Sequence, residues 1–102
     1  MPRHILNWVH WRQDAYGDDL ALHYFRDRDG REVDFVVTDR REPSLLVECK
    51  LSDGGPARGL KYLAGKFPKA EAWQIAATGR KRYKTPAGIR VAPAEVFLSG
   101  LV

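Results

Sequence analysis

Asp34, Glu48 and Lys50 are charged residues inside two segments that are otherwise rich in valine, leucine and phenylalanine. Such segments are typical of β-strands, and the polar residues 38–44 between them predict a hairpin with a tight reversal. If the hairpin is symmetric about Arg41, Asp34 faces Glu48 across the two strands. Directly opposed side chains have Cβ atoms about 5 Å apart, and like charges at that distance repel unless something compensates them. A divalent cation is the natural compensator.

The facing carboxylates of Asp34 and Glu48 offer hard oxygen ligands, which suit Mg²⁺ or Mn²⁺. A metal held there polarises a phosphate oxygen and lowers the pKa of a bound water. Side chains alternate along a strand, so Lys50 points to the same side as Glu48, where it can orient the water or stabilise the charge that develops on the phosphate. Glu32 then faces Lys50. It is an outer-shell carboxylate, a second metal ligand or the ion-pair partner of the lysine.

The turn signal at residues 27–30, Asp-Arg-Asp-Gly, connects a preceding strand at residues 20–26 to the strand that carries Asp34. With a four-residue turn, His23 faces Asp34, which makes His23 a candidate outer-shell residue. With a slip of one residue, Tyr24 faces Asp34 instead. The sequence leaves both registers open.

The predicted elements follow the order α, β, β, β, α, β with a short tail, which describes an α/β domain. Helices are expected at residues 2–14 and 56–67, and strands at residues 20–26, 31–38, 44–51 and 72–78. The first three strands form an antiparallel meander, and the second helix is a right-handed crossover to the buried fourth strand of a mixed sheet. Residues 89–91 are predicted as a short edge strand, followed by a last helical turn or two after Pro93.

Length and composition describe one domain, residues 1–102, with 44% hydrophobic and 29% charged residues. No apolar run approaches the about 20 residues of a membrane span, so we expect no membrane association and no signal peptide. The single cysteine, Cys49, fits a reducing cytoplasm. It points away from the face of Glu48, so it is predicted to be a small core residue rather than a nucleophile. The formal net charge of +4 permits a polyanionic partner without requiring one.

Two groups of basic residues are candidate contacts to nucleic acid. The first is a loop that contains Arg80, Lys81, Arg82, Tyr83 and Lys84. Cations around an aromatic side chain are typical of phosphate contacts with base stacking. Arg58 and Lys61, on the second predicted helix, extend this surface. A solvated basic loop and an ordinary wet helix face are the alternatives.

The position of Asp34, followed after a hairpin by Glu48-Cys49-Lys50 on an apolar strand, resembles the motif of the PD-(D/E)XK nuclease superfamily. That superfamily has the restriction-endonuclease-like fold, and the αβββαβ order predicted above is its core. The resemblance implies that Asp34 and Glu48 are metal ligands and that Lys50 is the catalytic lysine. It also implies functions in DNA restriction, repair and recombination.

Residues 24–37 and 47–52 are similar to one branch in particular. This is the C-terminal domain of unknown function that follows the ATPase module in many prokaryotic AAA+-type proteins. The similarity covers most of the chain, from the first helix to the strand at residues 72–78. It implies that an ATPase domain or another partner protein is a binding partner.

Two features depart from the family's pattern. Many active members carry a further acidic residue on the first helix, whereas this one offers His4, Asn7 and His10 before Asp14 near its end. There is also no Walker A pattern, so the ATPase module of the relatives is absent from the sequence. We therefore expect either a fragment of a longer ATPase-containing protein or a stand-alone relic of one.

Two functions follow from the sequence. The first is a Mg²⁺- or Mn²⁺-dependent, nuclease-like phosphodiesterase that binds nucleic acid, with DNA favoured over RNA. The second is a catalytically degenerate accessory module of an AAA+-type ATPase that binds nucleic acid or protein. A homodimer is a further alternative, because nucleases of this superfamily often cut two strands as pairs.

Overall fold

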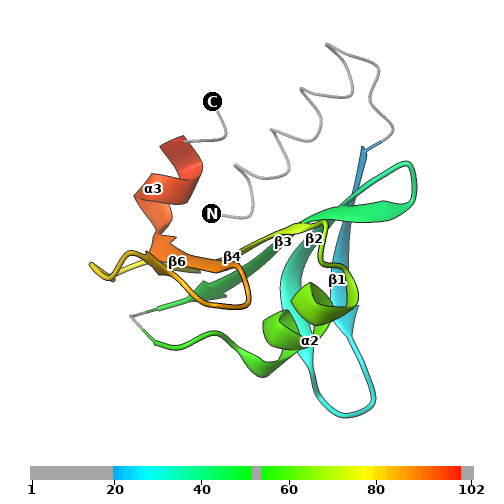
Figure 1. Cartoon of the computed structure of the whole chain (residues 1–102), viewed down its shortest axis with the longest axis horizontal. Coiled ribbons are helices and arrows are strands. Elements are labelled where there is room, and N and C mark those ends of the chain that lie inside the picture. The colour runs from blue at the N-terminus through cyan, green and yellow to red at the C-terminus, as the bar shows by residue number, and fades with distance from the viewer. Residues whose placement is uncertain (1–19, 52–53, 100–102) are drawn as a thin grey trace.

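The computed structural model of the protein describes residues 20–51 and 54–99, so the helix predicted at residues 2–14 lies outside the described residues. The described part is a mixed α/β fold with a six-stranded sheet and two helices (Figure 1). Along the chain the elements are β1 (Leu20–Arg26), β2 (Glu32–Asp39), β3 (Glu42–Lys50), α2 (Arg58–Lys66), β4 (Glu71–Ala76), β5 (Tyr83–Lys84), β6 (Ile89–Pro93) and α3 (Ala94–Ser99). Neither of these helices is long and apolar enough to cross a membrane.

The strands lie in the order β1-β2-β3-β4-β6-β5. β1, β2 and β3 form the predicted antiparallel meander, and β3, β4 and β6 run parallel. The prediction of an edge strand at residues 89–91 is wrong, because β6 lies between β4 and β5. The segment expected to be a basic loop adds Tyr83 and Lys84 as the two-residue strand β5, and this strand forms the edge.

The two helices cover opposite faces of the sheet (Figure 1), and alternate residues of the same strands supply the two cores. Val47 and Ile75 pack on the α3 side, against Phe97. Leu46 packs on the α2 side, against Leu60. All five side chains are buried. Each sheet face therefore has its own apolar cluster, which sets the positions of the polar residues between them.

Helix α2 lies very close to β2 because Gly59 has no side chain. A Cβ atom at Gly59 would lie 2.5 Å from the amide nitrogen of Glu32 and closer still to the carbonyl oxygen of Glu32. Leu60 and Leu63 follow on the buried face of the helix. The first turn of α2 is thus packed directly on the backbone at the start of β2.

The turn between β1 and β2 is held by side chains and is tied to α2. The Asp27 carboxylate accepts hydrogen bonds from the amides of Asp29 at 3.0 Å and Arg31 at 2.9 Å, and from Arg31 Nε at 2.5 Å. The Arg31 guanidinium lies 3.7 Å from the ring centre of Tyr62 on α2. Arg58, also on α2, donates to the carbonyl oxygen of Asp29. These contacts fix the hairpin relative to the helix.

The turn between β2 and β3 has a different construction. It consists of Arg40 and Arg41, which have positive φ angles of 53° and 72°. Two successive residues with positive φ are typical of the tight type I′ hairpin turn. The turn is therefore shorter than the polar break predicted at residues 38–44, and both strands extend into that stretch.

An irregularity near this turn restores the register predicted from the sequence. Beside the turn, Thr38 pairs with Pro43, which is not the pairing of a hairpin symmetric about Arg41. The register shifts between Thr38 and Val37, and at this point Ser44 Oγ donates a hydrogen bond to the Val37 carbonyl oxygen at 3.2 Å. Beyond the shift, Phe35 pairs with Val47. This is the pairing expected for a hairpin symmetric about Arg41, and it determines which side chains meet at the far end of the strands.

Candidate metal and catalytic site

Asp34 and Glu48 meet where the backbone pairing of β2 with β3 ends. The pairing reaches Phe35 and Val47. One step further, the Asp34 amide donates to Glu48 Oε1 at 3.2 Å, and the Cys49 amide donates to Asp34 Oδ2 at 2.9 Å. Each carboxylate therefore binds the main chain of the opposite strand. The hairpin brings the two acids together, as the predicted register requires.

The environment of Glu48 favours its protonated form. Its side chain is on the α2 face of the sheet, and the residue is 8% exposed. Burial, together with the hydrogen bond to Asp34 and the charge of Asp34, raises the pKa of Glu48 to about 7, while the charge of Lys50 acts in the opposite direction. The pair of acids therefore holds a proton at a higher pH than an ordinary carboxyl group would. A cation beside the pair would replace that proton.

Lys50 is the last residue of β3 and is exposed. It has the same strand parity as Glu48 and lies in register with Ala76 of β4. Glu32 is not its partner as the symmetric hairpin suggested. Instead Glu32 is paired with Arg26 of β1 in register, with 3.3 Å between Oε1 and Arg26 Nε. Lys50 thus lies at the end of the strand, near enough for its charge to lower the pKa of Glu48.

Of the two registers that the sequence left open for β1, the one that sets His23 opposite Asp34 is wrong. His23 pairs with Val36, and its Nε2 atom is 3.2 Å from Oγ1 of Thr38. The register shifts after His23. Tyr24 of β1 therefore lies opposite two residues of β2, Asp34 and Phe35. The wrong register for His23 follows from this β-bulge, in which two residues of one strand lie opposite one residue of the other. A bulge of this kind cannot be recognised from the alternation of apolar and polar residues.

Tyr24 is therefore the β1 residue nearest to the acids. It is 58% exposed. Desolvation, a hydrogen bond with Glu32 and the charges of Glu32 and Asp34 raise the pKa of Tyr24, while the charge of Arg26 lowers it. Its phenol is a neutral hydrogen-bonding group at the rim of the carboxylate site.

Gln74 is a buried polar residue that the sequence interpretation missed. It lies in register with Glu48 on the neighbouring strand β4 and is 2% exposed. Its Oε1 atom accepts from the Ala57 amide at 2.7 Å, and its Nε2 atom donates to the carbonyl oxygens of Gly54 at 3.0 Å and Gly55 at 2.6 Å. One amide side chain thus holds the segment before α2 beside the acids. Its signal in the sequence is a single polar residue within the apolar run at 72–77.

Cys49 behaves as predicted. It packs with the apolar cluster on the α3 side, opposite the face of Glu48. Burial and the negative charges of Asp34 and Glu48 raise the pKa of the Cys49 thiol to about 11. A thiol must ionise to act as a nucleophile, so the raised pKa disfavours that role, and Cys49 packs as a half-buried residue against the apolar cluster.

The candidate nucleic-acid contacts fall into two separate places. Arg58 and Lys61 are exposed on α2, and Arg58 is engaged with the β1–β2 turn. The remaining ones, Arg80, Lys81, Arg82, Tyr83 and Lys84, are exposed at the opposite edge of the sheet. The structure therefore does not bring the two groups into the single surface that the sequence suggested.

The donor set at Asp34 and Glu48 fits Mg²⁺ or Mn²⁺. Each side chain uses one oxygen for a main-chain amide in the hydrogen bonds described above. Within residues 20–51 and 54–99, no group of three or more histidine, cysteine, aspartate or glutamate side chains is placed to hold a metal ion. Mg²⁺ does not need such a cage, because it commonly binds through one or two carboxylates and keeps several waters.

A family model described as "Domain of unknown function (DUF4143)" matches residues 4–97. Domains of this family are found with AAA-type ATPase modules, as the resemblance of residues 24–37 and 47–52 implied. No curated protein and no solved structure matches the chain.

Proposed function

The chain belongs to the DUF4143 family, and we propose that it is a nuclease-like domain that hydrolyses phosphodiester bonds of nucleic acid with Mg²⁺ or Mn²⁺. One observation carries the proposal: Asp34 and Glu48 bind each other's strands across β2 and β3, with Lys50 on the same strand face as Glu48. The resemblance to the PD-(D/E)XK motif supports it. So does the parallel strand β4, reached through α2 as in that superfamily's core.

Asp34 and Glu48 would hold the metal, which when bound supplies a polarised phosphate oxygen and a water of lowered pKa. The hydrogen bonds from the amides of Asp34 and Cys49 orient the two carboxylates before any ligand arrives. Such preorganisation matters because a ligand that must first be ordered binds more weakly. Burial of Glu48 against the α2 core keeps bulk water from one side of the pair.

Lys50 would act on the substrate. Its exposed ammonium group can reach a phosphate that approaches the open end of β3, and its charge favours the ionised form of Glu48. A positive charge placed where negative charge builds on the phosphate lowers the barrier of hydrolysis. The position at the strand end separates this lysine from the buried core, so its removal should leave the fold intact.

The activity test incubates the protein with plasmid, single-stranded and branched DNA in Mg²⁺ or Mn²⁺. Wild type is expected to cleave at least one substrate, and Lys50→Ala is expected to lose cleavage. Lys69→Ala, which removes another exposed lysine, serves as the matched control and should cleave like wild type. Cleavage by Lys50→Ala at the wild-type rate would remove Lys50 from the mechanism.

The metal itself is tested by calorimetric titration with Mn²⁺. Wild type and Lys50→Ala should both bind, whereas Asp34→Asn and Glu48→Gln should bind at least about 10-fold more weakly, as expected when a carboxylate ligand becomes an amide. Both amides keep an oxygen for the main-chain hydrogen bond, so the hairpin should persist. Equal binding by all four proteins would place the metal elsewhere.

A second candidate function is an accessory module that docks on an ATPase domain. The occurrence of the family with AAA-type ATPase modules favours it. This function predicts no divalent-metal binding and no cleavage. It also predicts that Asp34→Asn and Glu48→Gln leave the docking unchanged.

A further inference from the structure

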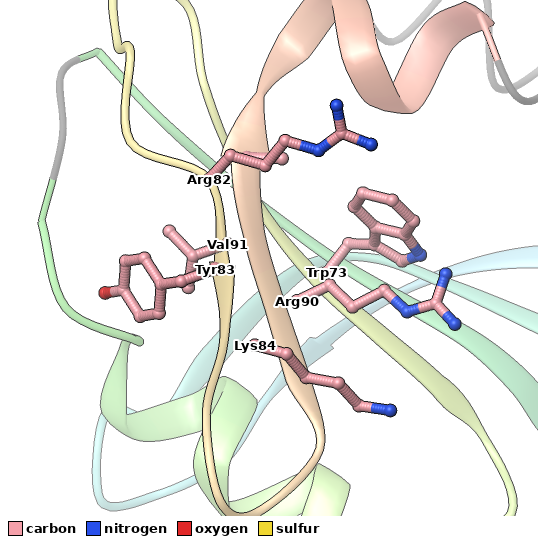
Figure 2. Close-up of a pocket in the computed structure, with 7 residues that line it drawn as sticks. Trp73, Arg82, Tyr83, Lys84, Arg90 and Val91 are labelled. Carbon is pink, nitrogen blue, oxygen red and sulfur yellow. The ribbon is translucent and has the colours of Figure 1, made fainter.

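A second polar site lies on the other face of the sheet, at the edge formed by β4, β6 and β5. It is a pocket of about 450 Å³ lined by Trp73, Arg82, Tyr83, Lys84, Arg90, Val91 and Ala92 (Figure 2). The carboxylate site faces α2, whereas Trp73 belongs to the cluster on the α3 side. The pocket is thus separate from Asp34 and Glu48.

The strand pairing directs the cations of this pocket to one side. Lys84 pairs with Arg90, and Tyr83 pairs with Val91, which packs toward α2. Residues directly opposed across two strands share a face. Figure 2 shows Arg82, Lys84 and Arg90 on the side of the Trp73 indole, and the Tyr83 ring on the opposite side of β5.

The pocket is lined by cationic side chains, and one of them is held in place by neighbouring residues. Its described lining contains three cationic side chains and no acid. Arg90 lies 5.3 Å from the ring centre of Trp73, and its Nη1 atom is 3.3 Å from Glu71 Oε1, which also accepts from Trp73 Nε1 at 2.8 Å. Arg90 is therefore held beside the indole by the Glu71 carboxylate that both side chains contact. Lys84 extends from the exposed strand β5, and Arg82 extends from the residue directly before it.

We propose that this pocket binds the phosphodiester backbone of single-stranded nucleic acid through Arg82, Lys84 and Arg90. Lys84 is in β5 and Arg82 directly precedes it, and residues two apart in an extended chain are about 7 Å apart, which is comparable with the separation of consecutive phosphates in an extended single strand. Arg82 and Lys84 are thus spaced to contact neighbouring phosphates. Guanidinium groups match the paired oxygens of a phosphate.

Arg90 and Trp73 account for the preference for an unpaired strand. The exposed guanidinium of Arg90 and the half-buried indole of Trp73, 5.3 Å from it, are two neighbouring planar groups on which an unpaired base can stack. The bases of a duplex are stacked inside the helix, so a duplex could contact this site only through its phosphates and the cationic side chains. The site extends the proposed function by adding a place for a strand away from the carboxylates, and its binding does not depend on cleavage.

The test measures fluorescence anisotropy of a labelled 12-nucleotide oligothymidine in EDTA, which excludes cleavage. Arg82→Glu/Lys84→Glu should bind at least about 10-fold more weakly than wild type at low salt. The dependence of log affinity on log salt should flatten by about 1.4, the value for two lost phosphate contacts on a single strand. Arg28→Glu/Arg40→Glu, in the β1–β2 and β2–β3 turns, makes the same change in net charge outside the pocket lining and should bind like wild type.

A local readout links the binding to this pocket. The indole N–H signal of Trp73, assigned with Trp73→Phe, should shift when the oligonucleotide is added. Undiminished binding by Arg82→Glu/Lys84→Glu, or an unmoved Trp73 signal, would overturn the proposal. Equal affinity for thymidine monophosphate, for a duplex of the same length or for an acidic peptide would also overturn it, in favour of a nucleotide site, a duplex site or a protein-binding site.

Discussion

The two faces of the sheet are built from alternate residues of the same strands, yet they carry different polar groups. On the α2 side, β3 and β4 contribute Glu48 and Gln74, both buried. On the α3 side, Trp73 packs under Arg90 at an edge that is rich in cations. Buried polar groups need partners, and here they have them. Exposed cations such as Arg82 and Lys84 are hydrated by solvent, so they need no partner within the protein. The comparison shows that the acidic site depends on the exact packing of the fold, whereas the basic edge depends mainly on its charge.

The largest effect is expected from Asp34→Asn on the acidic side. Cleavage should fall by at least about 100-fold, because even the outer partners of a metal site are worth 10–100-fold. Asparagine retains an oxygen for the Cys49 amide, so the loss would be chemical rather than structural. Cleavage is followed on the substrate that wild type cuts best, and an unchanged unfolding midpoint is the control. A variant that cuts normally would remove Asp34 from the site.

Gly59→Ala tests the close packing of α2 on β2. The added Cβ would collide with the backbone of Glu32, so we expect a loss of about 2 kcal/mol in the free energy of unfolding. Gly65→Ala in the same helix meets no atom within 4 Å and should instead stabilise the protein by about 0.5–1 kcal/mol. Urea denaturation measures both. If the two variants are equally stable, the contact between Gly59 and β2 is not tight.

Gln74→Met tests the buried amide. Methionine fills a similar volume but cannot replace the hydrogen bonds to Ala57, Gly54 and Gly55, so a loss of about 1–2 kcal/mol is expected. Ser44→Ala removes an exposed side chain with one hydrogen bond and should cost less than about 0.5 kcal/mol. Thermal unfolding compares them. A cost for Gln74→Met no greater than that for Ser44→Ala would show that the amide does not hold the segment before α2.

A pH dependence of stability is expected from Glu48. Its pKa of about 7 in the folded protein is above the ordinary value of 4.5, so the folded state binds this proton more tightly than the unfolded chain. The resulting stability is present below about pH 4.5 and is lost as the pH rises through 7. Glu48→Gln should remove this decline from urea titrations between pH 4.5 and 7.5. Identical pH profiles for the two proteins would contradict the shift.

The meander, the crossover helix and the facing of Asp34 and Glu48 were predictable from local signals. Apolar runs of β-branched residues predict strands, and the period of two along them assigns each side chain to a face. The expected symmetry held at Phe35 and Val47 because the shift beside Val37 compensates for the shorter turn at Arg40 and Arg41. Asp34 and Glu48 therefore face each other as predicted partly because the effects of the shorter turn and of the register shift on the pairing cancel.

The chain's own pattern determined which residues are acidic, which strands carry them and that Cys49 belongs to the core. Tertiary structure decided the rest. Because of the bulge after His23, Tyr24 and not His23 lies opposite Asp34. Because β5 pairs with β6, β6 is not the edge strand of the sheet. The arrangement of Gln74, Arg90 and Trp73 likewise depends on contacts between distant segments. Local sequence encodes periodicity and turn preference, but bulges, strand order and partners of buried polar groups are settled only when the whole sheet packs.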